Sequence, residues 1–183
     1  MRVLVACEFS GRVRDQFISQ GHQAVSCDLL PAEGENTESH YQGEVGDIIM
    51  DGWDMMIAFP PCTYLCSSGL HWNRRVDGRQ ANIRRIALEN PVGCISTRIR
   101  PPDQTIHPYQ FGDDASKRTC LWLRGLPKLR PTAYVEPRWV GTRPRWANQT
   151  DSGQNRLAPS PTRAKQRSTT YPGIAQAMAR QWG

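Results

Sequence analysis

The residues with the clearest chemical potential are Phe59-Pro60-Pro61-Cys62, which close a short apolar run at 53–58. Such a run followed by two prolines is typical of a buried strand that ends in a stiff turn. Open α/β sheets bind ligands at the carboxyl ends of their strands, so a thiol held there can act as a nucleophile. The alternative is a buried structural cysteine, since cysteine is among the most buried residue types.

A second polar cluster, Glu89-Asn90-Pro91, ends an apolar run that begins near Arg85. A carboxyl group beside a nucleophilic cysteine can protonate a heterocycle under attack, and a neighbouring amide can orient that acid. The alternative is an ordinary exit from a strand into a loop.

The N-terminal third of the chain predicts a nucleotide-cofactor site. Residues 2–7 predict a strand, and Phe9-Ser10-Gly11 predicts a turn after it. The spacing of the next apolar residues predicts a helix that ends near Gln20-Gly21. Asp28 closes a predicted strand at 22–28, where an acid can accept from ribose hydroxyls, and Asp47 can accept from an adenine amino group. Each of these residues alone also fits a simple structural turn.

The order of strand, helix and strand predicts an α/β fold with a doubly wound, mostly parallel, Rossmann-like sheet. Further strands are expected at 85–91, 107–112 and 119–123, with a short crossover helix near 74–82. We expect a core over 1–123, a mostly irregular Pro/Arg/Trp-rich region over 124–168, and a C-terminal region over 169–183 that packs on the core with its helix at 174–179.

The net charge of +6 is concentrated in one segment. Residues 130–167 hold seven arginines and one lysine against Glu136 and Asp151, which accounts for the whole excess. Arginines with interleaved aromatic residues suit a surface that binds phosphates and bases. The candidates are Arg138, Trp139, Arg143, Arg145 and Trp146. The alternative is a solvated basic loop.

Several classes of protein are not expected. No apolar run approaches the ~18 residues of a membrane helix, and the N-terminus fits a first strand better than a signal peptide. The six cysteines contain no CxxC pair, so we expect neither a zinc ribbon nor a disulfide framework, and no metal site. A reducing cytoplasm is the simplest compartment.

The chain resembles the DNA cytosine-5 methyltransferases. Pro60-Pro61-Cys62 and Glu89-Asn90-Pro91 are similar to the Pro-Cys and Glu-Asn-Val motifs of that family, and Phe9-Ser10-Gly11 falls where it has a Phe-x-Gly cofactor turn. The whole chain also resembles a group of small phage-type relatives, in its opening Val-Ala-Cys-Glu-Phe-Ser-Gly and its ending Tyr-Pro-Gly-Ile-Ala. If the chain is encoded by a phage, this resemblance implies that the protein is located in the cytoplasm of a bacterial host.

The resemblance implies a mechanism and its residues. Cys62 adds to C6 of cytosine, Glu89 hydrogen-bonds N3, Asn90 holds that geometry, and S-adenosylmethionine gives its methyl group to C5. The base is flipped out of duplex DNA or lies in single-stranded DNA. Cofactor contacts are implied for Phe9 on the adenine, Asp28 on the ribose and Asp47 on the amino group, and for Ser10, Gly11, Leu29 and Pro60. Lys117 and Arg118 are implied near the flipped nucleotide.

Four features depart from the family pattern. The cofactor turn has one glycine, and Pro91 replaces the valine of the Glu-Asn-Val motif. The span between Arg74 and Arg85 is shorter than expected for the related small proteins, as if a helix were lost, and the region before the last helix is too short for a dedicated recognition domain. The last two departures motivate an alternative. Specificity can then be slight or come from a protein partner. The alternative function is a weakened relative that binds DNA or the cofactor within a larger assembly.

Overall fold

The computed structural model describes residues 1–60 and 83–183, and within them a seven-stranded sheet of order β3-β2-β1-β4-β5-β7-β6. Its strands are β1 (Arg2–Ala6), β2 (Gln23–Asp28), β3 (His40–Gln42), β4 (Met55–Ala58), β5 (Arg85–Pro91), β6 (Gln104–Ile106) and β7 (Thr119–Arg124). The first five pair in parallel, whereas β7 pairs antiparallel with both β5 and β6. The predicted α/β class with a mostly parallel sheet is thus confirmed.

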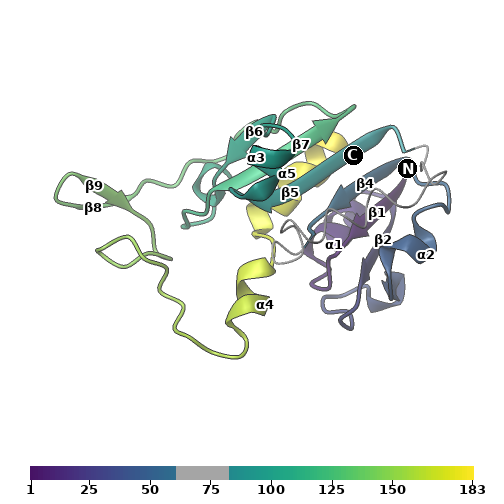
Figure 1. Ribbon diagram of the computed structural model, residues 1–183, viewed down its shortest axis with the longest axis horizontal. Coiled ribbons are helices and arrows are strands. Elements are labelled where there is room, and N and C mark those ends of the chain that lie inside the picture. Colours follow the sequence, from purple (N-terminus) through teal and green to yellow (C-terminus); the bar gives the residue numbers. More distant parts are fainter. Residues whose placement is uncertain (61–82) are drawn as a thin grey trace.

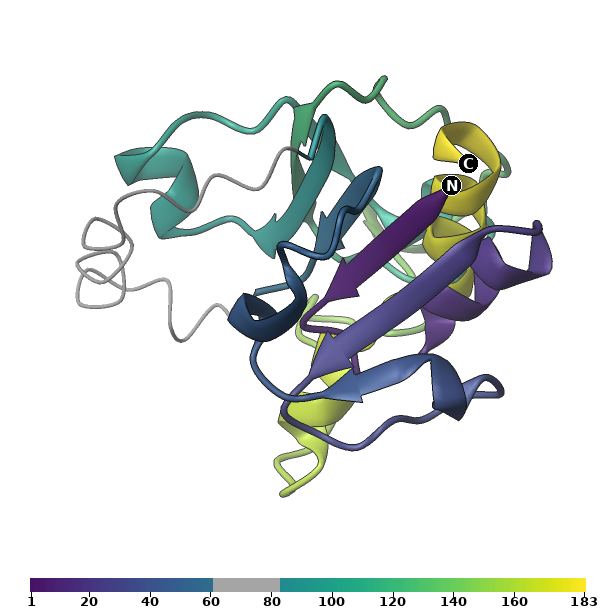
Figure 2. The same ribbon diagram turned by 90° about the vertical axis from the view of Figure 1, so that its right-hand side faces the viewer.

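Helices cover both faces of the sheet (Figures 1 and 2). On one face α1 (Arg12–Ser19) and α5 (Pro172–Trp182) pack together, and on the other lie α2 (Val45–Ile48) and α3 (Cys94–Arg98). The alternation of side chains along the strands explains this division. Val3 and Val5 are fully buried with α1 and α5, whereas Leu4 and Ala6 belong to the cluster that α2 covers.

The closing helix is longer than the predicted 174–179. Its inward face contributes Ile174, Met178 and Trp182 to the main core, all at most 3 % exposed. Pro172 occupies the first turn, where its missing N–H costs no hydrogen bond. The helix begins beside the ends of β4 and β5, because Tyr171 and Ile174 line one hollow together with Phe59 and Glu89.

The predicted strand at 107–112 is wrong. The strand β6 ends at Ile106, and Pro108–Gln110 forms a short 3-10 helix, η3. Pro108 cannot donate to a sheet ladder, and the backbone N–H of His107 donates instead to the Gln110 side chain at 2.7 Å. A further 3-10 helix, η1 (Thr37–Ser39), precedes β3.

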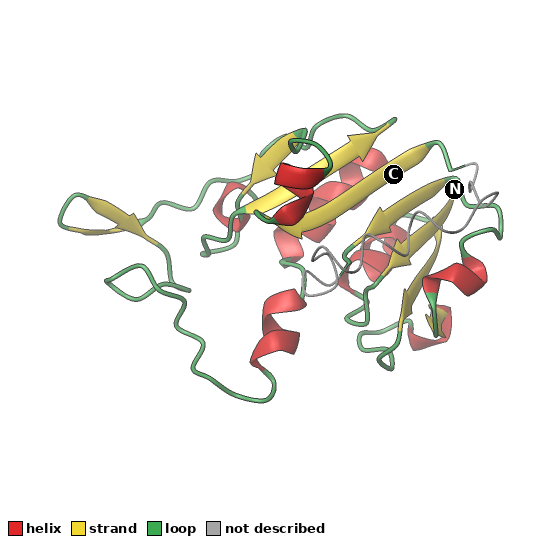
Figure 3. Ribbon diagram, in the orientation of Figure 1, coloured by secondary structure: helices red, strands yellow, loops and turns green. Residues whose placement is uncertain are grey.

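Residues 124–168 are mostly loop, as predicted (Figure 3). They contain one small hairpin, β8 (Arg138–Val140) with β9 (Arg143–Arg145), and the short helix α4 (Arg163–Ser168). Figure 1 shows the hairpin standing away from the sheet. The predicted crossover helix near 74–82 lies outside the described residues.

In the part of the chain that the structure describes, no helix is long and apolar enough to cross a membrane.

Candidate functional site

The candidate site lies where the parallel strands end. The turn after β1 is shaped by two residues with left-handed backbone, Cys7 (φ 58°) and Gly11 (φ 70°). A Cβ on Gly11 would lie 2.2 Å from Arg14 Nη2 and 2.6 Å from the Glu33 carbonyl oxygen. Only glycine therefore fits at position 11. The space that a side chain there would need is filled by Arg14 and Glu33 of the chain itself.

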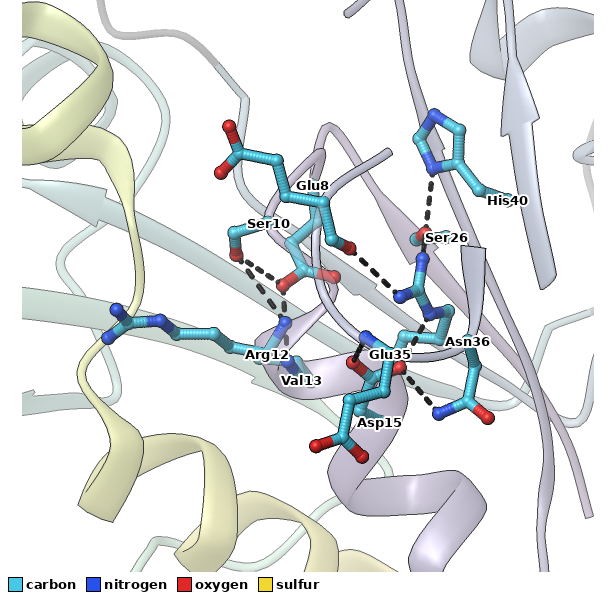
Figure 4. Close-up of polar contacts among 11 residues, drawn as sticks. Glu8, Ser10, Arg12, Val13, Asp15, Ser26, Glu35, Asn36 and His40 are labelled. Atoms are coloured by element: carbon cyan, nitrogen blue, oxygen red, sulfur yellow. Dashed lines mark hydrogen bonds and ion pairs between the residues drawn. The ribbon is translucent and has the colours of Figure 1, made fainter. Parts of the chain in front are cut away.

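Glu8, which the sequence reasoning missed, is the buried acid of this turn. Its Oε1 accepts hydrogen bonds from Ser10 Oγ at 2.8 Å and from the Val13 backbone N–H at 3.1 Å (Figure 4). Its Oε2 is buried and has no hydrogen-bond partner among the described residues. Burial raises the pKa of Glu8, while the bonds from Ser10 and Val13 oppose that shift. The available signal was an acid directly after an apolar strand.

Arg14 joins this turn to the loop after β2. Its fully buried guanidinium bonds Asp15, Ser26 and the Glu33 carbonyl at 2.8, 2.9 and 3.1 Å. Ser26 Oγ lies in turn 2.8 Å from His40 Nδ1. A buried charge needs such a complete set of partners. The network therefore fixes the position of the loop that carries Asp28 and Leu29.

The predicted cofactor residues after β2 and β3 reach the same edge. Asp28 Oδ1 accepts from the Leu30 backbone N–H at 2.9 Å, and Leu29 is 63 % exposed. Asp47, in α2, accepts from the Tyr41 hydroxyl at 3.1 Å. Burial, together with the negative charges of Asp28 and Glu44, raises the pKa of the Cys7 thiol to about 11. Cys7 is therefore a protonated thiol at neutral pH, unsuited to nucleophilic attack.

Glu89 and Asn90 lie at the end of β5 opposite Leu121 and Cys120 of β7. The Asn90 side chain is 4 % exposed, and its Nδ2 donates to the Pro60 carbonyl oxygen at 2.7 Å. This bond ties the end of the β4 segment to the end of β5. Cys62 itself lies outside the described residues, two positions after Pro60.

Glu89 lines a small, partly open hollow between the strand ends and the start of α5. Its other lining residues are Phe59, Lys117, Thr119, Ser168, Thr170, Tyr171 and Ile174. Burial raises the pKa of Glu89, and the positive charge of Lys117 opposes the shift. A carboxyl group in this setting keeps its proton to a higher pH than an exposed glutamate, as a proton donor requires.

The lining residues of this hollow that come from the C-terminal part of the chain were not predicted from the sequence. Thr170 and Tyr171 immediately precede α5, and the Asp113 carboxylate holds the start of that helix by accepting from the Gly173 N–H at 3.0 Å. The Tyr-Pro-Gly pattern gave the position of the helix start. It could not show that this start faces Glu89.

The predicted DNA-binding residues fall into three places. Lys117 lies in the wall of the hollow and donates to the Arg167 carbonyl oxygen at 3.1 Å, and Arg118 beside it is exposed. Arg138, Trp139, Arg143 and Arg145 lie on the hairpin, where Trp139 is 65 % exposed.

Trp146 differs from Trp139 in its surroundings. Its ring stacks on Tyr109 with centroids 4.2 Å apart, and Asn148 exchanges two hydrogen bonds with the backbone of Ser116. Trp146 thus anchors the loop that follows the hairpin, whereas Trp139 points its ring toward solvent.

The class that this fold defines is an α/β protein whose sheet order is similar to the methyltransferase topology. Comparison of the chain with models of known protein families finds no match, and neither does comparison with curated proteins. The function is therefore inferred from the motifs and from the geometry of the strand ends.

Proposed function

We propose that this protein is an S-adenosylmethionine-dependent methyltransferase that acts on C5 of cytosine in DNA through a covalent adduct of Cys62. The observation that carries the proposal is the bond from Asn90 to Pro60 at 2.7 Å, beside the hollow lined by Glu89. It joins Pro60 of one motif to Asn90 of the other, thirty residues later in the chain.

The residues at this edge fit such a cofactor in kind. Asp28 offers a carboxylate that accepts only one hydrogen bond within the described residues, Leu29 offers an exposed apolar side chain, and Glu8 has a buried oxygen without a partner. When bound there, the cofactor supplies an electrophilic methyl group on a sulfonium. Such carboxylates can accept hydrogen bonds from the ribose hydroxyls and the ammonium group of this cofactor.

The chain's own residues supply the activation of the base. The Cys62 thiolate forms a bond to C6, and the displaced electron pair makes C5 nucleophilic. Glu89 in its protonated form, which burial favours by raising its pKa, donates to N3 and offsets the charge that develops on the ring. After C5 has taken the methyl group, loss of its proton returns the electron pair and breaks the carbon–sulfur bond. Asn90 holds the Pro60 carbonyl oxygen at the end of β5, next to Glu89.

Covalent trapping tests this proposal. DNA containing 5-fluorocytosine should form an adduct that survives denaturation, because fluorine at C5 cannot leave as the proton does. We expect the adduct only when S-adenosylmethionine is present, its loss in Cys62→Ser, and its retention in the control Cys66→Ser. No adduct at saturating cofactor and DNA would contradict the proposed chemistry.

A second function is favoured by one specific observation. Phe9, the proposed aromatic contact of the cofactor, is only 6 % exposed, and the Lys165 ammonium group lies over its ring. A weakened relative that binds DNA or the cofactor in a larger assembly would tolerate this covered ring. Calorimetry separates the two: cofactor binding without an adduct supports this alternative, and no cofactor binding at millimolar concentration leaves a DNA-binding role alone.

A further inference from the structure

A positive charge of the chain itself lies on the face of Phe9. The Lys165 Nζ of α4 is 5.0 Å from the centroid of the ring, and the same ammonium group forms an ion pair with the Glu33 carboxylate. An aromatic face with a carboxylate beside it is a combination that binds organic cations, because the ring quadrupole and the negative charge act together. These three groups were not paired by any motif in the sequence.

The helix that brings Lys165 to this place is held mainly by polar contacts. None of the six residues of α4 is buried. Besides the ion pair, the segment is fastened by the bond from Lys117 to the Arg167 carbonyl and by the bond from Arg12 Nη1 to the Thr170 carbonyl at 3.1 Å. Such a segment, without buried apolar contacts, opens at small free-energy cost.

The Lys165 and Glu33 side chains are themselves 45 % and 51 % exposed, so solvent screens their pairing. The ammonium group can therefore leave the ring without exposing an unpaired charge to a buried environment. When the ammonium group has left, the face of the Phe9 ring and the Glu33 carboxylate remain beside the turn that follows β1.

We propose that Phe9 and Glu33 form a binding site for an onium group, that Lys165 fills it in the free protein, and that the positive group of a ligand displaces Lys165. The identity of the ligand rests on the proposed function: it is the sulfonium centre of S-adenosylmethionine. In this arrangement the sulfonium, and not the adenine, lies against Phe9. The adenine then has the exposed Leu29 beside Asp28 as its apolar contact.

This site has a consequence for turnover. Once the methyl group has left, the sulfur is an uncharged thioether and loses its attraction to the ring and the carboxylate. Lys165 can then return to Phe9 and oppose rebinding of the product. The site therefore favours the charged cofactor over the uncharged product.

The first test uses choline and its uncharged carbon analogue 3,3-dimethylbutan-1-ol, with binding followed by the NMR signals of the Phe9 ring. We expect Lys165→Met to bind choline about tenfold more tightly than the wild type, because the competing ammonium group is gone. Arg167→Met, on the same helix, should bind as the wild type does. The carbon analogue should not gain affinity in any of these proteins.

A double variant, Lys165→Met with Glu33→Gln, should lose most of the gained choline affinity, and thermal melting checks that each variant is folded. Equal choline affinity in wild type and Lys165→Met, or equal binding of the uncharged analogue, would overturn the inference. S-adenosylmethionine and S-adenosylhomocysteine are then compared in the same proteins. Choline binding as expected, without binding of S-adenosylmethionine, would keep the onium site and refute the proposed function.

Discussion

Glu89 is the side chain whose chemistry depends most on its surroundings. It faces the hollow with Lys117, and burial raises its pKa against the influence of that lysine. The proton is held more firmly in the folded protein than in the unfolded chain. As pH rises from the unfolded-state pKa toward the folded-state pKa, ionisation of Glu89 therefore lowers the free energy of unfolding.

Glu89→Gln and Lys117→Met test this balance by their pH profiles. If the protonated Glu89 is the active form, the rate falls as pH rises through its pKa, and removal of the Lys117 charge should move that fall to higher pH. Glu89→Gln should lower kcat by about 100-fold or more with little change in DNA affinity. Single-turnover methylation at saturating DNA measures the rate of each variant across the pH range. If the fall in rate occurs at the same pH in Lys117→Met as in the wild type, the charge of Lys117 does not affect Glu89 as proposed.

At the scale of elements, the site depends on where α5 begins. The Gly173 N–H is held by Asp113, and a Cβ at Gly173 would lie 1.9 Å from the Phe111 carbonyl oxygen. The helix start can approach that carbonyl only because residue 173 has no side chain. Tyr171 and Ile174, which flank it, line the hollow.

Gly173→Ala should therefore destabilise the protein by about 1–3 kcal/mol, because the start of α5 must move away from Phe111. Gly46→Ala in α2 is the matched control, since a Cβ there meets nothing within 4 Å. That change should be neutral or stabilise by about 0.5–1 kcal/mol. Urea unfolding measures the free energy of unfolding of both variants. Equal changes would show that the close approach of residue 173 to the Phe111 carbonyl oxygen does not constrain the start of α5.

At the scale of the whole molecule, charge and shape are arranged together. The segment that holds the entire excess of positive charge contains the hairpin that stands away from the sheet (Figure 1). On that hairpin Arg138 bonds Asp151 at 2.6 Å and Arg145 bonds the Asp151 carbonyl oxygen, whereas the Arg143 side chain forms no hydrogen bond or ion pair within the described residues. Arg143 is therefore the hairpin arginine most available to a phosphate.

We expect DNA affinity to fall steeply with salt, because phosphate contacts release counterions. Arg143→Gln should reduce the slope of log affinity against log salt by about one. Arg124→Gln, at the far end of β7, should leave the slope unchanged. Binding to duplex and single-stranded DNA over a salt series measures this, and a flat response would assign residues 130–167 to a solvated loop.

The sequence alone determined most of the local structure. Short apolar runs specified β1, β2, β4, β5 and β7, because strands covered on both faces are apolar along most of their length. Helical spacing specified α1, and the Ala-rich run after Pro172-Gly173 specified α5. It also placed Glu89 and Asn90 at a strand end. It failed at 107–112, where Pro108 outweighed the apolar pattern.

Only the tertiary structure decided which of these ends meet. The antiparallel insertion of β7 beside β5, the bond from Asn90 to Pro60, and the hollow between Glu89 and Tyr171 all join segments far apart in the chain. The cation of Lys165 on Phe9 does so as well. Local pattern encodes which face of an element is buried, but not its partner, because that choice depends on how all the buried faces pack into one core.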